Sequence, residues 1–449
     1  MSIPASATAR RFGRAGRHAG RGGQWLAAGP WAMLALTLSW LVLMLRQLPC
    51  LIRGGDYFPA MCYSDISVLF YWRGISEGKV PFLQADLEYP VLTGALIDIT
   101  RRLTNLIGGQ TAPGLSAEEV ARSAGLFFGV NALVLFILFG VLVWTHLKLS
   151  RPWDALMIAA SPAIMTAGLI NWDALVVALT SLALLAWSRK RPSLTGLWLG
   201  LGIAAKLYPV LLLVPLAVLC LRTSRWRDFF ITVGTTVGAW VAVNLPIYLL
   251  APQGWINFWT FNVDRGGDLG SVWYVLSLAG VELQRVSLWV ATLMVGGTLA
   301  ICLLLLLSKR RARLGQGVFL VVALFLMLNK VYSPQYVLWL LPLLVLARPR
   351  WREWIVFSVA EVLYFVAIWA HLDGVLYPGA GTQERLYWLA VGLRVAVQFW
   401  LCLLVVADIV NPRRDIVRAD GSDDSDGGVF DHAVDAPWLQ RLRAALVRG

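Results

Sequence analysis

The feature that most constrains this chain is a repeated alternation of apolar runs with short basic clusters. The apolar runs extend from about residue 30 to about residue 411, and the longest reach the roughly 20 residues needed to cross a bilayer. Charged residues make up only 14% of the chain, against about 25% in soluble domains. The pattern predicts an all-α polytopic membrane protein.

Taken in order, the apolar runs predict about 12 transmembrane helices in one domain, residues 30–411. The expected spans are 30–52, 120–146, 152–169, 172–188, 193–206, 208–222, 227–250, 286–308, 314–330, 334–347, 351–371 and 386–411. Several mid-chain spans are too short for a full crossing. Short or broken helices are tolerated at membrane depth where they line a cavity.

The net charge of +13 does not indicate a nucleic-acid partner, because the basic residues fall in clusters between the spans. With the basic N-terminus placed in the cytosol, every dense cluster falls on the same side of the membrane. These clusters are Lys148/Arg151, Arg189–Arg191, Arg222/Arg225/Arg227, Lys309–Arg311/Arg313, Arg348/Arg350/Arg352 and Arg413/Arg414. We therefore expect a plasma-membrane protein with both termini in the cytosol.

The segments outside the spans have distinct characters. Residues 1–29 are basic and Gly-rich, and residues 412–449 are acidic and then basic, so both tails are expected to be largely disordered. The first external loop, 53–119, carries two amphipathic patterns, at about 64–77 and 91–107, typical of helices that lie in the membrane interface. Cys50 and Cys62 flank the start of this loop and would form a disulfide only if they lie close together in an oxidising compartment.

The polar motifs fall on the external side, opposite the basic clusters. Asp65, just after the first span, is the candidate catalytic base. The alternatives are a solvated loop carboxylate or a helix cap. Asp56 is a rival carboxylate, but it follows Gly54 and Gly55 and is more typical of a turn.

Two further motifs carry candidate ligands for an anionic substrate. Asn171 and Asp173 interrupt two short helices, where they would either cap the second helix or face a cavity. Lys206 and Lys330 interrupt apolar sequence on the side that the basic clusters avoid. A snorkelling lysine is the alternative, but a lysine beside a Pro-broken helix suits a phosphate, with tyrosine hydroxyls as added donors.

Other candidates accompany these motifs. The residues near the two lysines that would bind the donor are Tyr208, Tyr332, Ser333, Gln335 and Arg265. Arg265 could equally be an ordinary loop residue, and His371, the external histidine, is more often structural at a helix end. Glu88 and Tyr89 form a corner of the first loop and are further candidates.

An external carboxylate, several cations and apolar grooves together indicate one type of chemistry. The cations would hold a lipid-linked phosphate that enters from the bilayer, and the carboxylate would deprotonate an acceptor hydroxyl. No P-loop or dinucleotide fingerprint is present, so neither a nucleotide donor nor a cofactor is expected. Because Ser64 rather than a second carboxylate precedes Asp65, we do not expect a metal held by paired carboxylates.

These motifs resemble those of glycosyltransferase family 87, the actinobacterial polyprenyl-phosphate-mannose-dependent mannosyltransferases of the C-type fold. The resemblance covers residues 30–411 and is carried by Asp65, Tyr71, Gly78–Pro81, Glu88–Pro90, Asn171–Asp173, Ala205–Pro209 and Asn329–Tyr336. Within the family, the chain is similar to the phosphatidylinositol-mannoside enzymes. The resemblance implies an inverting transfer from a polyprenyl-phosphate sugar to a glycolipid or glycan acceptor, with Asp65 as the base and the cations on the donor phosphate.

Three alternatives remain at this stage. Related C-type enzymes transfer arabinofuranose from a decaprenyl-phosphate donor, so the sugar could be arabinose rather than the expected mannose. A transporter or flippase for a lipid-linked sugar would also contain short broken helices, but it should show inverted repeats, which we do not find in the sequence. A non-catalytic assembly partner would not need Asp65.

Overall fold

The computed structural model describes residues 27–441, apart from 54–56, 282, 378, 380 and 420. Within these ranges the chain is helical, and its only β-type pairing is an isolated bridge between Pro81 and Ala85. The prediction of an all-α protein is confirmed. The predictions for Asp56 and for most of the N-terminal segment fall outside the described residues.

Six described helices are long and apolar enough to cross a membrane. They are α2 (Ala28–Arg53), α5 (Ala117–Leu147), α11 (Trp226–Leu250), α14 (Val286–Leu307), α17 (Trp351–Leu372) and α18 (Glu384–Val410). Many of their large apolar side chains face outward, as expected for helices whose surroundings are lipid rather than water. The chain is a polytopic membrane protein, as predicted.

Shorter apolar helices fill the interior between the long ones. They are α8 (Asp173–Ser188), α9 (Pro192–Ala205), α10 (Leu213–Thr223), α15 (Leu314–Leu328) and α16 (Val337–Ala347). Most residues of α8, α15 and α16 are buried, which explains why these segments are apolar on all sides.

The predicted span at 152–169 is wrong as a continuous helix. It is divided into α6 (Ala155–Ala159) and α7 (Pro162–Ala167). Pro162 has no N–H to continue the helix, and the Ser161 hydroxyl instead accepts from the Ala163 N–H and starts a new one. The total of about 12 crossings therefore stays a prediction.

The first loop contains the two predicted helices, α3 (Asp65–Trp72) and α4 (Val91–Leu106). Helix α3 ends earlier than predicted because Gly74 has a left-handed φ of +67°, which stops the helix after Arg73. Cys50 and Cys62 form a disulfide with a Cα–Cα distance of 6.0 Å, which settles the question that the sequence left open. Two helices were not predicted, α12 (Pro252–Asp264) and α13 (Val272–Leu278).

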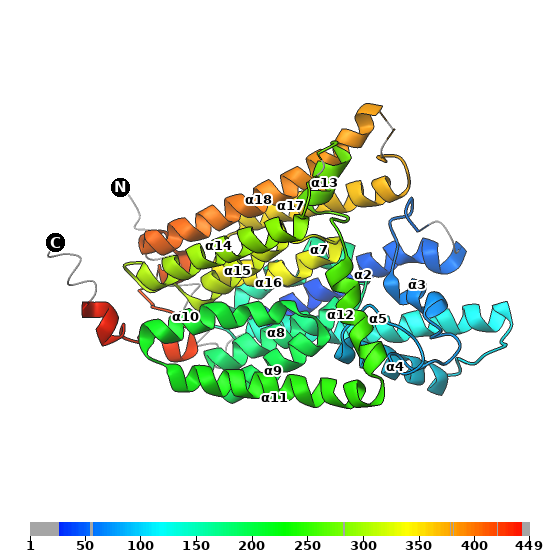
Figure 1. Ribbon diagram of the computed structural model, residues 1–449, viewed down its shortest axis with the longest axis horizontal. Coiled ribbons are helices and arrows are strands. Elements are labelled where there is room, and N and C mark those ends of the chain that lie inside the picture. The colour runs from blue at the N-terminus through cyan, green and yellow to red at the C-terminus, as the bar shows by residue number, and fades with distance from the viewer. Residues whose placement is uncertain are drawn as a thin grey trace.

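The first loop and the C-terminal segment lie at opposite ends of the molecule (Figure 1). We call the end that carries α3 and α4 the loop end, and the end that carries residues 411–441 the tail end. Basic clusters meet at the tail end, where acidic residues of the C-terminal segment bind them. The ion pairs join Arg222 to Asp435, Arg311 to Asp423 and Arg313 to Asp415.

The expectation of a largely disordered C-terminal tail is wrong for its described part. Short 3-10 turns form at Pro412–Arg414, Ile416–Arg418 and Gly428–Phe430. Phe430 is fully buried and packs on Trp187 with a ring-centroid distance of 5.1 Å. The acidic composition resembles that of a solvated linker, but here the carboxylates neutralise arginines at the ends of the bundle.

Gly428 tests whether the tail is docked as described. Its φ is +62°, and a Cβ placed on it would lie 1.9 Å from the Trp187 carbonyl oxygen. We expect Gly428→Ala to detach the tail, since the left-handed conformation alone costs roughly 1–2 kcal/mol and the backbone clash adds to it. Limited proteolysis within 412–441 should accelerate at least severalfold.

Gly421→Ala is the matched control for this experiment. Gly421 also has a positive φ, of +87°, but nothing lies within 4 Å of its Cβ position. This variant should be cleaved more slowly than Gly428→Ala. Equal cleavage of Gly428→Ala and the unaltered protein would contradict the docking of the tail on Trp187.

Candidate functional site

Asp65 is the first residue of α3 and is held against the turn that precedes α8. The cap of α3 is Ser64, whose hydroxyl oxygen accepts from the Ile66 N–H at 3.2 Å, so Asp65 itself is not the cap. The Asp65 N–H donates to the Ile170 carbonyl at 2.7 Å. The Ser64 hydroxyl donates to the neighbouring Leu169 carbonyl at 2.5 Å. The backbone therefore fixes the base candidate while leaving its carboxylate available.

Tyrosine side chains bind the Asp65 carboxylate. The Tyr89 hydroxyl donates to Oδ2 of Asp65 at 2.5 Å, and the Tyr63 side chain is a second hydrogen-bond partner. Tyr89 immediately precedes Pro90, the cap of α4, and its ring packs edge-on against Trp172. The first loop and the Asn171–Asp173 motif therefore meet at Asp65.

A buried ion pair lies beside these groups. Lys206 Nζ is 2.8 Å from Oδ1 of Asp173, and the Trp339 indole N–H donates to Oδ2 of Asp173 at 2.9 Å. Asn171 accepts from the Asp173 N–H at 3.0 Å. Asp173 is buried, and its charge is compensated by a cation and a neutral donor.

Lys206 links the ion pair to the Tyr89–Asp65 pair. Its ammonium lies 5.1 Å from the centre of the Tyr89 ring and 5.4 Å from that of Tyr336. We call Asp65, Tyr89, Asn171, Asp173, Lys206 and Trp339 the carboxylate cluster. The structure thus brings together predicted residues from the first loop, the 171–173 motif and the 205–209 motif.

The surroundings make Asp65 a stronger base than an ordinary aspartate. Loss of solvation raises the pKa of Asp65, while the hydrogen bonds from Tyr89 and Tyr63 and the charge of Lys206 lower it. The charge of Asp173 raises the pKa of Asp65 further. Burial also raises the pKa of Tyr89, so this hydroxyl stays protonated and can donate. The cluster can therefore accept a proton from a bound hydroxyl.

A small apolar cavity of about 10 Å³ adjoins Tyr89. Its walls come from the first loop, α9, α11 and α12. Three indole rings, those of Trp240, Trp255 and Trp259, are part of the lining. An apolar wall next to the cluster keeps the local polarity low and strengthens the electrostatic interactions there.

The residues around Lys330 lie elsewhere. The Lys330 ammonium donates to the Val263 carbonyl at 3.1 Å, so the structure places it against α12. Arg265 forms an ion pair with Asp268 at 2.6 Å. Their predicted contacts with a phosphate stay predictions.

Other predicted residues belong to packing clusters. The Tyr208 ring stacks on the Trp339 ring, with 4.6 Å between their centroids, and so packs against a member of the carboxylate cluster. His371 is buried and stacks on Tyr387 at 4.1 Å, which fits the structural alternative for this histidine. Glu88 forms an ion pair with Arg73.

Tyr332, Ser333 and Gln335 lie near or within an interior polar network that the sequence did not indicate. Its centre is Arg394 of α18, fully buried and paired with Glu361 of α17 at 2.9 Å. The guanidinium also donates to the Tyr332 carbonyl at 2.8 Å and to the Ser333 carbonyl at 3.4 Å. Gln335 is buried. A charge inside an apolar run was the signal that could have identified Arg394.

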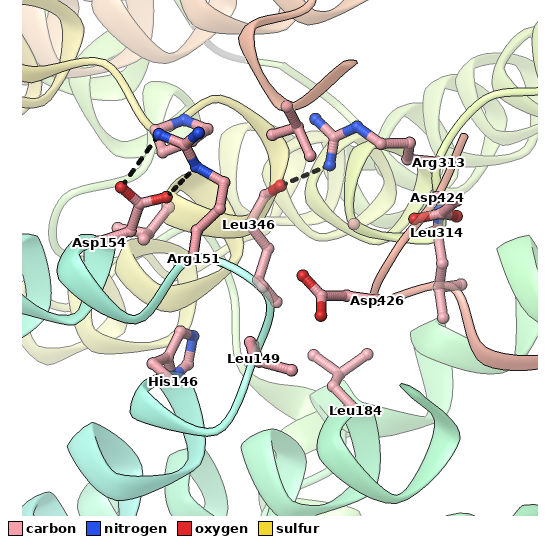
Figure 2. A pocket seen from close by; sticks show the side chains of 14 residues that line it. His146, Leu149, Arg151, Asp154, Leu184, Arg313, Leu314, Leu346, Asp424 and Asp426 are labelled. Atoms are coloured by element: carbon pink, nitrogen blue, oxygen red, sulfur yellow. Dashed lines mark hydrogen bonds and ion pairs between the residues drawn. The ribbon is translucent and has the colours of Figure 1, made fainter. Parts of the chain in front are cut away.

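A second cavity, of about 40 Å³, lies at the tail end (Figure 2). Arg151 pairs with Asp154 at 2.6 Å on one side, and Arg313 donates to the Leu346 carbonyl at 2.8 Å on the other. Burial raises the pKa of Asp424 to about 6, which places this carboxyl partly protonated near neutrality. The paired charges and small volume favour a structural role in seating the tail.

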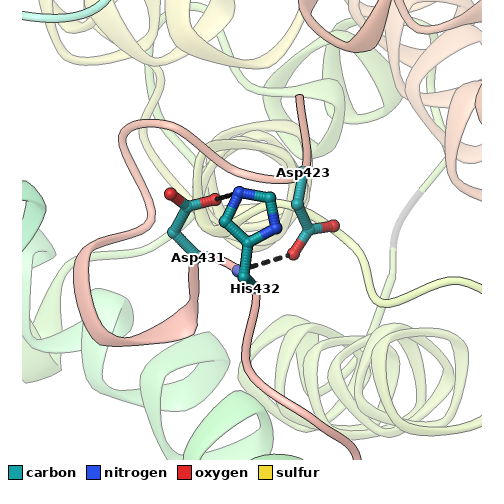
Figure 3. Close-up of side chains that lie close together, drawn as sticks. All are labelled: Asp423, Asp431 and His432. Atoms are coloured by element: carbon teal, nitrogen blue, oxygen red, sulfur yellow. Dashed lines mark hydrogen bonds and ion pairs between the residues drawn. The ribbon is translucent and has the colours of Figure 1, made fainter. Parts of the chain in front are cut away.

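One cluster has the spacing of a metal site but not its electrostatics. Ligand atoms of Asp423, Asp431 and His432 lie within 4.8 Å of one another (Figure 3). Asp423 already forms ion pairs with Arg310 and Arg311, and its carboxylate accepts from the His432 N–H at 3.1 Å. Guanidinium groups beside the cluster oppose a cation there.

Two comparisons with known proteins indicate the family that this chain resembles. Residues 115–330 match the model of glycosyltransferase family 87, which confirms the predicted resemblance. The matched range contains Asp173 and Lys206 but begins after Asp65 and Tyr89.

The chain is also similar to a curated protein of Mycobacterium tuberculosis, the polyprenol-phosphate-mannose-dependent alpha-(1-2)-phosphatidylinositol mannoside mannosyltransferase. The two are 27% identical over 299 residues, which covers 60% of this chain. The match spans 66% of the relative's length, just under two thirds.

The hydrogen bond from Tyr89 predicts how Asp65 titrates. Tyr89→Phe removes a donor that stabilises the charged carboxylate, so the pKa of Asp65 should rise further. The shift can be followed by infrared difference spectroscopy of the carboxylate band, with Asp65→Asn to assign the signal. Tyr71 lies on the exposed side of α3, the helix that begins with Asp65, so Tyr71→Phe should leave the pKa of Asp65 unchanged. An unchanged or lowered pKa in Tyr89→Phe would contradict the assigned geometry.

Proposed function

We propose, from the match to glycosyltransferase family 87, that this chain is an integral-membrane glycosyltransferase that uses a polyprenyl-phosphate sugar as its donor. The sugar we propose is mannose, because the relative from Mycobacterium tuberculosis is described as polyprenol-phosphate-mannose-dependent. The acceptor is a cell-envelope glycolipid or glycan.

The observation that carries the proposal is the carboxylate cluster. It combines a carboxylate of raised pKa, Asp65, with a cation, Lys206, at one end of a membrane domain. A glycosyl transfer needs both groups, because a proton must leave the acceptor hydroxyl and negative charge must develop on the departing phosphate.

In the proposed reaction, Asp65 takes the proton of the acceptor hydroxyl as that oxygen attacks the anomeric carbon. The bond between that carbon and the donor phosphate oxygen breaks, and its electrons leave with polyprenyl phosphate. Attack from the face opposite the phosphate inverts the configuration, so a β-linked donor gives an α-linked product. The Lys206 ammonium lies 5.1 Å from the centre of the Tyr89 ring and would stabilise the phosphate charge.

The positive-inside rule gives the orientation of the proposed enzyme. Basic residues gather at the tail end and bind the C-terminal segment there, so we place this end in the cytosol. The carboxylate cluster then faces the external side of the plasma membrane. A lipid-linked donor suits that location, where nucleotide sugars are lacking.

The test is sugar transfer by the purified protein in lipid, with radiolabelled polyprenyl-phosphate-mannose and a membrane glycolipid acceptor. Asp65→Asn keeps the shape of the side chain but removes the base, and we expect turnover to fall by about a hundredfold or more. Donor binding should persist. Equal turnover by the two proteins would contradict the role of Asp65 and make Asp173 the next base to test.

The donor and the class of protein are tested in the same assay. Transfer only from decaprenyl-phosphate-arabinose would replace the proposed sugar. Movement of an intact lipid-linked sugar across vesicle membranes, without transfer, would support a transporter instead.

Substituting each of the two lysines in turn tests which of them contributes to the affinity for the donor. Lys206→Ala should weaken donor binding by roughly tenfold or more, since a charge-assisted hydrogen bond contributes about 1.5–3 kcal/mol. Lys330→Ala is the comparison, because the structure places this lysine against Val263 and not in the carboxylate cluster. Equilibrium binding of polyprenyl phosphate would measure both. Wild-type affinity in Lys206→Ala would contradict its proposed contact with the phosphate.

A further inference from the structure

Arg46 is a charged side chain in the C-terminal half of α2, a helix long and apolar enough to span a membrane. Its guanidinium donates to carbonyl oxygens of two separate segments. Nε donates to Met165 at 3.2 Å, Nη2 donates to Thr166 at 2.8 Å, and Nη1 donates to Met61. Its guanidinium carbon also lies 5.1 Å from the centre of the Phe365 ring.

A charge in a membrane helix is costly, so it is normally paired with another charge or with main-chain carbonyls, and it often has a functional role. Arg46 contacts main-chain carbonyls, an aromatic ring and the side chain of Gln47. Met165 and Thr166 belong to the last turn of α7, where carbonyls lack partners within the helix and a cation is favoured.

The two segments bound by Arg46 lead directly to the carboxylate cluster. Beyond Met61, the chain reaches Ser64 and Asp65 within a few residues, and beyond Thr166 it reaches Asn171 and Asp173. The segments then meet again, because Ser64 and Asp65 donate to the Leu169 and Ile170 carbonyls. Arg46 therefore holds the two segments together at one end. The hydrogen bonds at Asp65, the proposed base, hold them together at the other end.

Neighbouring residues of α2 reinforce the same attachment. The Gln47 amide, oriented to satisfy both of its polar atoms, donates to the Cys62 carbonyl at 2.8 Å and accepts from Arg46 at 3.2 Å. The disulfide joins Cys50, one turn further along α2, to Cys62. Three positions of one helix thus hold residues 61–62.

We infer that Arg46 is a positioning residue that sets the distance between Asp65 and the Asp173–Lys206 ion pair. It acts through the backbone and does not touch the reacting groups. The inference rests on the proposed glycosyl transfer for its effect on rate. The attachment itself is a structural statement that can be tested separately.

The test compares Arg46→Gln and Arg46→Lys with the unaltered protein in lipid. We expect Arg46→Gln to lower kcat by about 10- to 100-fold, since small misplacements of catalytic groups cost up to about this much. The KM for the donor should change less than about threefold, because Lys206 is retained. Arg46→Lys keeps one charged donor and should recover part of kcat.

Hydrogen exchange of the backbone amides gives a readout that does not depend on activity. In Arg46→Gln, peptides that contain 61–66 and 168–173 should exchange faster, because the amide of Asp65 loses its fixed partner. Peptides from α14 and α15 should be unchanged. Arg46→Lys should show a smaller acceleration in the same peptides. If Arg46→Gln does not fold, the measurement on Arg46→Lys alone tests the inference.

Arg313→Gln is the matched control. Arg313 is also a buried arginine that donates to two main-chain carbonyls, those of Leu346 and Ala347, but at the tail end. Arg313→Gln should reduce the stability of the protein without accelerating hydrogen exchange in 61–66 or lowering kcat per folded molecule.

Unchanged exchange in 61–66 and 168–173 in both Arg46 variants would overturn the inference. So would a fall in kcat that Arg313→Gln reproduces. If the unaltered protein transfers no sugar from any lipid-linked donor, the proposed function fails while the exchange result still decides whether Arg46 fixes the two segments.

Discussion

The loop end of this protein depends on the ion pair between Asp173 and Lys206. Both groups lie within the bundle, where an unpaired charge would be costly, and the Trp339 indole completes the bonding of the carboxylate. Because the lysine also lies over the Tyr89 ring, the pair fixes the tyrosine that binds Asp65. A change in one member therefore affects the charge and the position of the base.

The site is built where regular helices stop. Asp173 starts α8, Lys206 follows the last residue of α9, and Asp65 starts α3. Helix ends leave main-chain donors and acceptors without partners inside the helix. In this bundle those groups bind one another across segments, as Asp65 and Ile170 do. The long helices α2 and α5 pack around this region, and the ends of the short helices carry the residues of the carboxylate cluster.

The sequence predicted helices more reliably than contacts. The boundaries predicted for α8 and α9 agree with the structure to within one residue, because apolar runs and helix breakers are local signals. Asp173 and Lys206 were both predicted as site residues, but as separate ligands, since they are 33 positions apart in the chain and their pairing depends on packing. Arg46 and Arg394 were not predicted because each is a single charge inside an apolar run, and its partners come from segments far away in the chain. The docked tail was missed because its carboxylates pair with arginines far away in the chain.

The arginines at the tail end serve two purposes at different times. In the orientation proposed above, basic clusters hold the flanking segments in the cytosol during synthesis and so set the orientation of the helices. The acidic segment that later binds Arg222, Arg311 and Arg313 follows the last helix, so docking can be completed only after every span has been made. The arginines that first direct insertion therefore later bind the C-terminal segment. The tail can dock fully only when the helices that carry these arginines are assembled.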